Sequence, residues 1–484
     1  MPVPLGRRNR LPAVLLAFGL AGTCGAQPTR PSLERTVDSL FAEYDGTPGV
    51  AIAVIRHGTP ELLKGYGLAN LEYRTPITPS TRFNIASVSK QFTAFAIHLL
   101  QRQGRLSLDD DIRRYIPELP DHGRPIRIRH LLAHTSGLRD QAALLAIAGW
   151  HAEDVVTTEQ VIRLVSRQSS LNFPTGTAFG YSNTGYTLLA EAIARITGMR
   201  FAEYARRHIF EPLGMRRTVF LDDFHTVLDE HRAYSYERVG GSFVKREVHS
   251  STPGASGLMT TGEDLARWVA NFDRPLVGDA RLIADFNRIS QLDDGRPVIW
   301  SASPGDTTYH AKGQLHYTYK GQHVISHGGH DAAFRATLTR FPEAGLAVIS
   351  LSNNEHYPMM GKVLPIVDLY LGERAVRPMA AASAPTAATR PDVAAPFDRA
   401  PADVVGEYRS EELMTAYRIL VRNGTLVMTH LRLGDITLTP VATDRFSGTS
   451  TFPFTLRVLR EGGVVTGFEI SNFGAHNVRF DRQP

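Results

Sequence analysis

The 484-residue chain contains one cysteine, so no disulfide can form within it. It also lacks a long hydrophobic run, because the apolar stretch at residues 11–22 is shorter than the about 20 residues that a spanning helix needs. Neither charge dominates, since 53 basic residues face 48 acidic ones. These absences exclude a small disulfide-stapled domain and a multi-span membrane protein.

The N-terminal segment is separable from the fold. Residues 1–10 carry three arginines, residues 11–22 are largely apolar, and small residues at 24–26 precede Gln27. This order is typical of a secretory signal peptide, which we place at residues 1–26. Cleavage there would remove three arginines and no acidic residue, so the formal charge would fall from +5 to +2. A basic surface for nucleic acid therefore loses its support, and we expect no nucleic-acid partner.

The single cysteine, Cys24, allows a second interpretation of this segment. A lipoprotein would be acylated on that residue, but residues 21–23 lack the large aliphatic side chain expected ahead of such a cysteine. We therefore favour cleavage after Ala26 and expect a periplasmic or secreted protein with no transmembrane segment after cleavage.

The length of the chain predicts more than one domain. Residues 376–402 are dominated by alanine and proline, which bury little surface and are typical of a linker. This linker separates a main domain at residues 33–375 from a C-terminal domain at residues 403–484. Short strands with turn signals, among them Asn423-Gly424, follow one another in the C-terminal domain, which indicates a small antiparallel β-barrel or sandwich. Of the two we expect a barrel, of lipocalin-like type.

The main domain combines strand patterns at its two ends with helical patterns between them. Strand patterns occur at residues 50–55, 62–67, 316–320, 323–326, 336–341 and 346–351, and helical patterns occur at residues 92–100, 188–196, 265–272 and 360–371. This order predicts an α/β domain with one mixed or antiparallel sheet whose first and last parts meet, and with a helical region inserted between them.

Two residues at the start of the first helical pattern could perform chemistry. Residues three apart share a helix face, so Ser87 and Lys90 can approach each other without help from the rest of the fold. A serine hydroxyl becomes a good nucleophile when a neighbouring base takes its proton, and a desolvated lysine can serve as that base. A Ser-x-x-Lys pattern alone is weak, because a capped helix with a solvated lysine would look the same.

Two further motifs follow in the sequence. Tyr181-Ser-Asn183 stands directly before a helical pattern, and His327-Gly-Gly329 stands beside a strand, where glycines let a ligand lie against the strand edge. Each has a plain structural alternative. Tyr181 could be a core phenol, Asn183 a helix cap, and residues 327–329 an ordinary turn.

In this order, the three motifs resemble those of the serine β-lactamase and penicillin-binding protein family. The likeness is to the branch with class C β-lactamases, DD-peptidases, D-aminopeptidases and related esterases. Supporting stretches lie at residues 82–92, 128–138, 210–215 and 254–259, and the resemblance covers residues 33–372. It implies an antiparallel sheet flanked by helices with an inserted all-helical region. Residues 134–137 match the family as a structural loop.

The resemblance also implies roles for individual residues. Ser87 would form an acyl-enzyme, Lys90 and Tyr181 would share its proton, and Asn183 would hold the substrate amide. The backbone N–H groups of Ser87 and His330 would form the oxyanion hole. The substrate-binding set would be Asn183, His327, Gly328, Gly329 and His330. No cofactor is implied, and no metal site is expected, because His327 and His330 lack a carboxylate or cysteine partner at metal-binding spacing.

The third motif carries histidine where most β-lactamases of the family carry lysine. A histidine with an ordinary pKa near 6.5 is largely neutral at neutral pH, so it is poorly suited to hold a β-lactam carboxylate. Histidine at this place resembles D-specific peptidases and some DD-peptidases of the family, which implies hydrolysis of small peptides, amides or esters, with cell-wall-derived D-peptides as the expected class. We also expect a pH dependence through His327. A β-lactamase, a carboxylesterase and a non-turnover muropeptide receptor remain as alternatives.

Overall fold

The computed structural model describes residues 1, 30–223, 225–226, 231–247, 249–372 and 402–484. The signal peptide expected at residues 1–26 and the linker expected at 376–402 fall almost wholly outside this part of the chain. Within it, no helix combines the length and the apolar character needed to cross a membrane.

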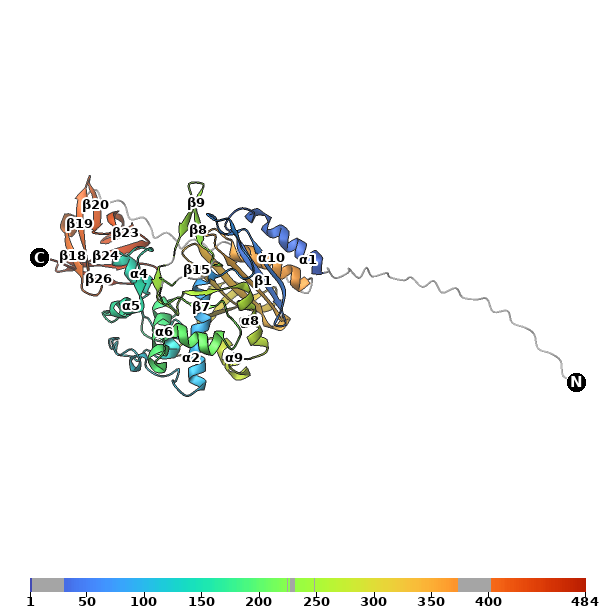
Figure 1. Cartoon of the computed structure of the whole chain (residues 1–484). Helices are drawn as coiled ribbons and strands as arrows, with labels where there is room; N and C mark the ends of the chain where they lie inside the picture. The colour runs from blue at the N-terminus through green and yellow to red at the C-terminus, as the bar shows by residue number, and fades with distance from the viewer. Residues whose placement is uncertain (2–29, 224, 227–230, 248, 373–401) are drawn as a thin grey trace.

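A large antiparallel sheet organises the main domain (Figure 1). Its order is β12-β13-β14-β15-β16-β17-β1-β2. The strands are β1 (Val50–Arg56), β2 (Thr59–Tyr66), β12 (Ile299–Ser303), β13 (Asp306–Ala311), β14 (Gln314–Tyr319), β15 (Gln322–Asp331), β16 (Phe334–Phe341) and β17 (Leu346–Ser352). Strand β1 pairs with β17, with Val50 opposite Ser352. The prediction that the first and last parts of the domain meet in one sheet is confirmed.

Strand β1 is apolar from Val50 to Ile55 because both faces of the sheet are covered there. Ala51, Ala53 and Ile55 face the larger core, which contains helices α2 (Lys90–Arg102) and α8 (Gly262–Asp273). The alternate residues, exemplified by Val50 and Val54, face a second core against α1 (Arg30–Phe41) and α10 (Met359–Leu371). Side chains in a strand point to opposite faces in turn, so a strand covered on both sides needs apolar residues at every position.

Helices fill the long segment between β2 and β12. Within the described residues the α-helices of this segment are α2 (Lys90–Arg102), α3 (Ile128–Leu132), α4 (Gln141–Ile147), α5 (Thr158–Val165), α6 (Asn183–Thr197), α7 (Phe201–Ala205), α8 (Gly262–Asp273) and α9 (Ala280–Asn287). Helices α1 (Arg30–Phe41) and α10 (Met359–Leu371) lie outside it, before β1 and after β17. The expected all-helical insertion also carries small sheets. Their strands are β3 (Leu68–Asn70), β4 (Thr75–Pro76), β5 (Phe83–Asn84), β6 (Val156–Thr157), β7 (Val219–Phe220), β8 (Ser235–Val239), β9 (Ser242–Arg246), β10 (Ser250–Ser251) and β11 (Leu258–Thr260).

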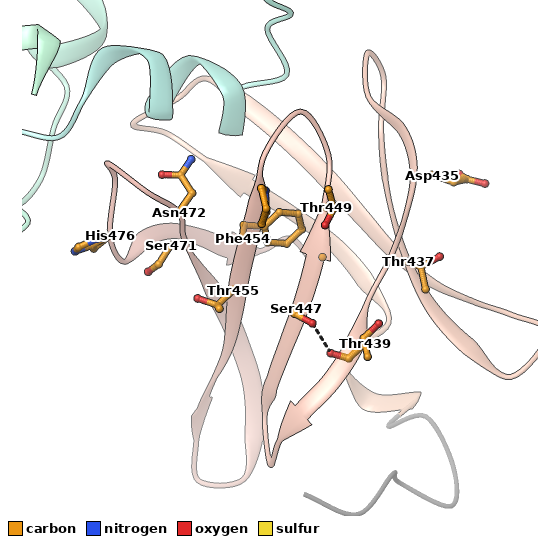
Figure 2. Close-up of a pocket in the computed structure, with 12 residues that line it drawn as sticks. Asp435, Thr437, Thr439, Ser447, Thr449, Phe454, Thr455, Ser471, Asn472 and His476 are labelled. Atoms are coloured by element: carbon orange, nitrogen blue, oxygen red, sulfur yellow. Dashed lines mark hydrogen bonds between the residues drawn. The ribbon is translucent and has the colours of Figure 1, made fainter. Parts of the chain in front are cut away.

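The C-terminal domain is one nine-stranded antiparallel sheet that curls toward closure. Its order is β21-β20-β19-β18-β26-β25-β24-β23-β22. The strands are β18 (Gly406–Ser410), β19 (Thr415–Arg422), β20 (Thr425–His430), β21 (Gly434–Thr437), β22 (Thr439–Ala442), β23 (Arg445–Thr449), β24 (Pro453–Glu461), β25 (Val464–Ser471) and β26 (Val478–Arg482). A hollow of about 870 Å³ near β21 and β23 is lined mainly by hydroxyl side chains such as Thr437 and Thr455 (Figure 2).

The two domains share a hydrophobic core. Apolar side chains of α4, among them Ala143, Leu144 and Ile147, belong to the same buried cluster as Tyr417 and Phe480 of the barrel. The Tyr417 hydroxyl donates to the Ile147 carbonyl at 2.8 Å. In Figure 1 the orange and red strands accordingly lie against α4 and α5. Helix α4 thus joins the barrel to the main domain.

Candidate active site

Ser87 lines a cleft of about 600 Å³. It belongs to a short 3-10 turn, η2 (Ala86–Ser89), which leads directly into α2. Ala86, the residue before it, has a φ of 47°, a conformation that non-glycine residues rarely adopt. The Asn84 side chain stabilises this turn, because its Oδ1 accepts the Ala86 N–H at 2.7 Å. The turn thereby presents the Ser87 hydroxyl to the cleft at the start of α2.

Lys90 lies directly behind the nucleophile and is fully buried. Its Nζ donates to Asn183 Oδ1 at 2.8 Å and to the Ala255 carbonyl at 2.7 Å. The third neighbour is Ser87 Oγ at 3.1 Å. A neutral amine has two hydrogens and one lone pair, and the two fixed acceptors use both hydrogens. The lone pair of neutral Lys90 therefore faces the Ser87 hydroxyl, which is the geometry that a general base needs.

Burial lowers the pKa of Lys90 to about 7, and the carboxylates of Asp140 and Asp331 oppose that shift. Removing a charged amine from water disfavours its protonated form, and two acceptors without a full counter-charge do not restore it. A substantial fraction of Lys90 is therefore neutral near pH 7. The environment supplies the deprotonated base that the Ser-x-x-Lys pattern required.

Tyr181 completes the contacts of the nucleophile. Its hydroxyl donates to Ser87 Oγ at 2.8 Å, and the Lys90 amine lies 4.9 Å from the centre of its ring. Burial raises the pKa of Tyr181 above its ordinary value, so the phenol keeps its proton at neutral pH. This arrangement leaves the role of base to Lys90 and fits Tyr181 to pass a proton onward.

Asn183, the first residue of α6, has its side-chain amide held on both sides. Its Oδ1 accepts from Lys90, while its backbone N–H and its Nδ2 both donate to Asp140 Oδ2, at 2.6 and 2.9 Å. The sequence identified Asn183 through its motif but gave no sign of Asp140. That residue comes directly before α4, where an aspartate is an ordinary helix cap.

His330, near the end of β15, lines the same cleft as Ser87. Strand β15 packs tightly on the turn that carries the nucleophile, because a Cβ on Gly329 would lie only 2.3 Å from the Ile85 carbonyl oxygen. Only glycine fits this approach. The two backbone segments expected to form the oxyanion hole are thereby brought to the same cleft, and their catalytic role stays a prediction.

His327 is buried behind the cleft. Its Nδ1 donates to the Gly328 carbonyl at 2.5 Å, so Nε2 carries the lone pair. Burial, assisted by the charge of Lys90, lowers the pKa of His327 to about 4. We expected hydrolysis to change with pH in the ordinary histidine range. The lowered pKa of His327 moves the expected change to acid pH. Gly328 belongs to the same strand, β15.

Several cleft residues had no signal in the sequence. Asp331, next to His330, accepts hydrogen bonds from Ser256 Oγ and Asn84 Nδ2, both on its Oδ2. Burial raises its pKa, and these hydrogen bonds oppose the rise. Arg335, which lines the same cleft, pairs with Glu355, so among the described residues no cation lies within ion-pair distance of the Asp331 carboxylate. The charge of Lys90 acts on Asp331 from farther away. Phe452, from the turn between β23 and β24 of the C-terminal domain, also lines the cleft.

The structure thus joins Ser87, Lys90, Tyr181 and Asn183 through hydrogen bonds and places His330 at the cleft wall. His134, assigned to a structural loop, accepts the Ser182 N–H on its Nδ1 and supports the segment that carries Tyr181. Across the described ranges, no group of three or more histidine, cysteine or acidic side chains could hold a metal ion.

Comparisons with known proteins agree with this architecture. The family model described as Beta-lactamase matches residues 37–372. The chain is 28% identical over 326 residues to Protein flp of Staphylococcus aureus, with 65% of this chain and 61% of that protein covered. It is 29% identical over 325 residues to the D-aminopeptidase of Brucella anthropi, with 67% and 59% covered. The matches thus span about three fifths of the length of these curated relatives.

Solved structures show the same fold. The octameric penicillin-binding protein homologue from Pyrococcus abyssi has a TM-score of 0.62 at 22% identity, covering 93% of this chain and 99% of that one. The D-amino acid amidase from Ochrobactrum anthropi SV3 has a TM-score of 0.57 at 24% identity, covering 71% and 98%. The first likeness extends into the C-terminal domain, because 93% of this chain exceeds the part occupied by the main domain.

Proposed function

The chain belongs to the beta-lactamase family, and from that premise we propose that it is a serine hydrolase that cleaves amide bonds of small peptides through an acyl-enzyme on Ser87. One observation carries the proposal. Ser87, which lines the cleft, has its Oγ within hydrogen-bond distance of both the Lys90 amine at 3.1 Å and the Tyr181 hydroxyl at 2.8 Å. A hydroxyl between a buried amine and a phenol is equipped for acyl transfer.

The reaction proceeds in two halves. Ser87 Oγ bonds to the substrate carbonyl carbon as its proton passes to the Lys90 lone pair, and backbone N–H groups stabilise the oxyanion. The carbon–nitrogen bond then breaks, and the leaving nitrogen receives that proton by way of Tyr181. In the second half, water adds to the acyl carbon and gives a proton to the same base. The carbon–oxygen bond to Ser87 breaks, and the hydroxyl regains its proton.

The cleft favours a substrate with an amine beside the scissile carbonyl. Asp331 follows the proposed oxyanion residue His330, and a protonated amine would supply the cation that this carboxylate lacks among the described residues. Charge-assisted hydrogen bonds of this kind are stronger than neutral ones. We propose an aminopeptidase or amidase of D-configured, cell-wall-derived peptides, and the D-aminopeptidase name of a relative supports that class.

The neutral, buried His327 disfavours the β-lactamase alternative. A β-lactam carries a carboxylate, and a histidine with its pKa lowered to about 4 supplies no positive charge at neutral pH.

We also propose that the protein is exported, because residues 1–26 have the pattern of a signal peptide. Mass spectrometry of the exported protein should then give a chain beginning at Gln27. An intact chain in the cytoplasm would contradict export.

A substrate panel tests the proposed function. The purified protein is assayed with D- and L-alanyl p-nitroanilide, p-nitrophenyl acetate and nitrocefin, alongside Ser87→Ala. The matched control is Ser89→Ala, because the Ser89 hydroxyl accepts the Leu258 N–H and takes no part in the site. We expect turnover of the D-alanyl anilide that Ser87→Ala abolishes and Ser89→Ala retains. Faster turnover of nitrocefin, or a stable adduct with fluorescent penicillin and no turnover, would contradict the proposal.

A further inference from the structure

We propose that Asp140 is a positioning residue, fixed by the C-terminal domain, that orients the Asn183 amide toward Lys90 and so makes both domains one catalytic unit. The inference rests on the proposed role of Lys90 as the base. It concerns neither a substrate contact nor the acyl-enzyme itself, but the means by which the base is held.

The two carboxylate oxygens of Asp140 have separate partners. Oδ1 accepts the N–H groups of Ala142 and Ala143, which caps the N-terminus of α4. Oδ2 accepts the backbone N–H and the Nδ2 of Asn183. An amide whose nitrogen is held in this way must turn its oxygen to the other side, where Lys90 Nζ donates to it. Asp140 therefore decides which end of the Asn183 amide Lys90 meets.

The C-terminal domain fixes Asp140 from behind. The Gly474 carbonyl, between β25 and β26, accepts the Asp140 N–H at 2.8 Å. Asn472 Nδ2 donates to the Ala143 carbonyl of α4 at 3.1 Å, and Figure 2 shows Asn472 beside the helices of the main domain. A Cβ on Gly474 would lie 2.7 Å from the Asp140 Cβ, so the two backbones approach as closely as a glycine allows.

A buried ion pair anchors the neighbouring residue. The Arg139 guanidinium is fully buried and pairs with Glu412 of the C-terminal domain. It also donates to the carbonyls of His476 and Asn477, in the loop that contains Gly474. Arg139 and Asp140 are consecutive, so the C-terminal domain holds this dipeptide at two points, the Arg139 side chain and the Asp140 N–H. Movement of that loop is transmitted to Asn183 without passing through the substrate.

The Asp140→Asn variant keeps the cap of α4 and removes the carboxylate oxygen that orients the Asn183 amide. The single side-chain oxygen of asparagine can still cap α4, but its NH₂ group would then face two donors of Asn183. The Asn183 amide is expected to turn, which would present its nitrogen to Lys90. Lys90 would lose an acceptor and a nearby negative charge, and both losses disfavour the protonated amine.

The titratable groups that face Lys90 are Asp140, Asp331, Tyr181, Tyr186, His134, His310 and His327. Only Asp140 changes in the proposed variant. A shift in the titration of Lys90 can therefore be assigned to Asp140 and to the amide that it holds.

The first experiment compares Asp140→Asn with Asp279→Asn. Asp279 caps α9 with one oxygen and pairs with Arg102 through the other, far along the chain from the site. For Asp140→Asn we expect kcat for p-nitrophenyl acetate to fall by about tenfold to 100-fold. The acid limb of kcat/KM should move to lower pH by about one unit, because less of the amine is protonated. Asp279→Asn should leave both unchanged.

The second experiment needs no turnover. The titration of Lys90 is followed by NMR in protein labelled with ¹³C at lysine Cε, and Lys90→Met identifies its signal. Asp140→Asn should lower the measured pKa of Lys90, and an unchanged pKa would overturn the inference. Loss of hydrolysis in Ser87→Ala tests the proposed function separately, so the two failures are distinguishable.

The third experiment tests the C-terminal domain. Gly474→Ala should push Asp140 and lower kcat at least about fivefold with KM unchanged, because no cleft residue is altered. Gly361→Ala in α10, where a Cβ meets only an ordinary contact, is the control. The NMR titration of Lys90 should shift in Gly474→Ala as well. Normal kcat and a normal Lys90 titration in a folded Gly474→Ala protein would overturn the role of the domain.

Discussion

The pH dependence of the unfolding free energy should show how much the burial of Lys90 destabilises the folded protein. Burial lowers the pKa of Lys90 from the ordinary 10.5 to about 7. At about 1.36 kcal/mol per unit, this difference amounts to roughly 5 kcal/mol between the two states of the chain. Replacing Lys90 with methionine, which has a similar length and no charge, removes the titrating group.

The sign follows from which state binds the proton. Between about pH 7 and pH 10.5, Lys90 is protonated in the unfolded chain and neutral in the folded one. The unfolded state therefore binds more protons, and the unfolding free energy of the native protein rises with pH across this window. Lys90→Met lacks this contribution, so its advantage over the native protein should shrink by roughly 4 kcal/mol from pH 7 to pH 10.5.

The slope is more informative than the absolute stability. Methionine also leaves Asn183 Oδ1 and the Ala255 carbonyl without a donor, which costs about 1–3 kcal/mol each whatever the pH. Urea unfolding at several pH values, with the two proteins compared at each pH, cancels all other titrating groups. Lys320→Met is the control with the opposite sign, because Asp368 raises the pKa of Lys320. A difference between Lys90→Met and the native protein that stays constant with pH would refute the reasoning.

Three further predictions concern the cleft and the domain contact. Asp331→Asn should raise KM for D-alanyl p-nitroanilide about tenfold or more and leave p-nitrophenyl acetate unaffected, and equal effects on both would contradict amine recognition. Phe452→Ala should raise KM about fivefold for anilides that cover roughly 50 Å² of the ring, with the acetate ester insensitive. Glu412→Ala should lower the unfolding free energy by about 3–5 kcal/mol, because it leaves Arg139 buried without its partner. Glu159→Ala, which breaks an exposed pair, should cost about 0.5 kcal/mol or less in the same urea titration. Equal losses of unfolding free energy in Glu412→Ala and Glu159→Ala would contradict the importance of the buried ion pair.

The sequence predicted the elements whose signals are local. Ser87 and Lys90 meet because they are three positions apart along a helical turn, so their contact needs no tertiary information. The continuous apolar run of β1 and the helical spacing of apolar residues in α8 were visible for the same reason. Strand β12 gave no such signal, because all five of its residues are exposed and no buried face imposes a pattern.

Contacts between distant segments could not be predicted from single residues. Asp140 is 43 positions from Asn183 in the sequence. Ala255, whose carbonyl accepts a hydrogen bond from Lys90, is 165 positions from Lys90. In the sequence, Asp140 is indistinguishable from an ordinary helix cap, and it does cap α4. The role of its second oxygen, which accepts from Asn183, can be seen only in the folded structure, where α6 lies beside it. Phe452 is still more distant, since it reaches the cleft from the other side of the linker.

The surroundings of Lys90 explain how the fold supplies a base without a nearby cation to lower its pKa. His134 and His310 lie with ring centres 4.8 Å apart, and His134 lies 4.4 Å from the Tyr181 ring. Burial lowers the pKa of both histidines and of His327, and a proton on Lys90 lowers all three further. These imidazoles are therefore neutral at neutral pH. They fill the space behind the base with polar rings that exclude water yet carry no charge, so desolvation dominates its titration.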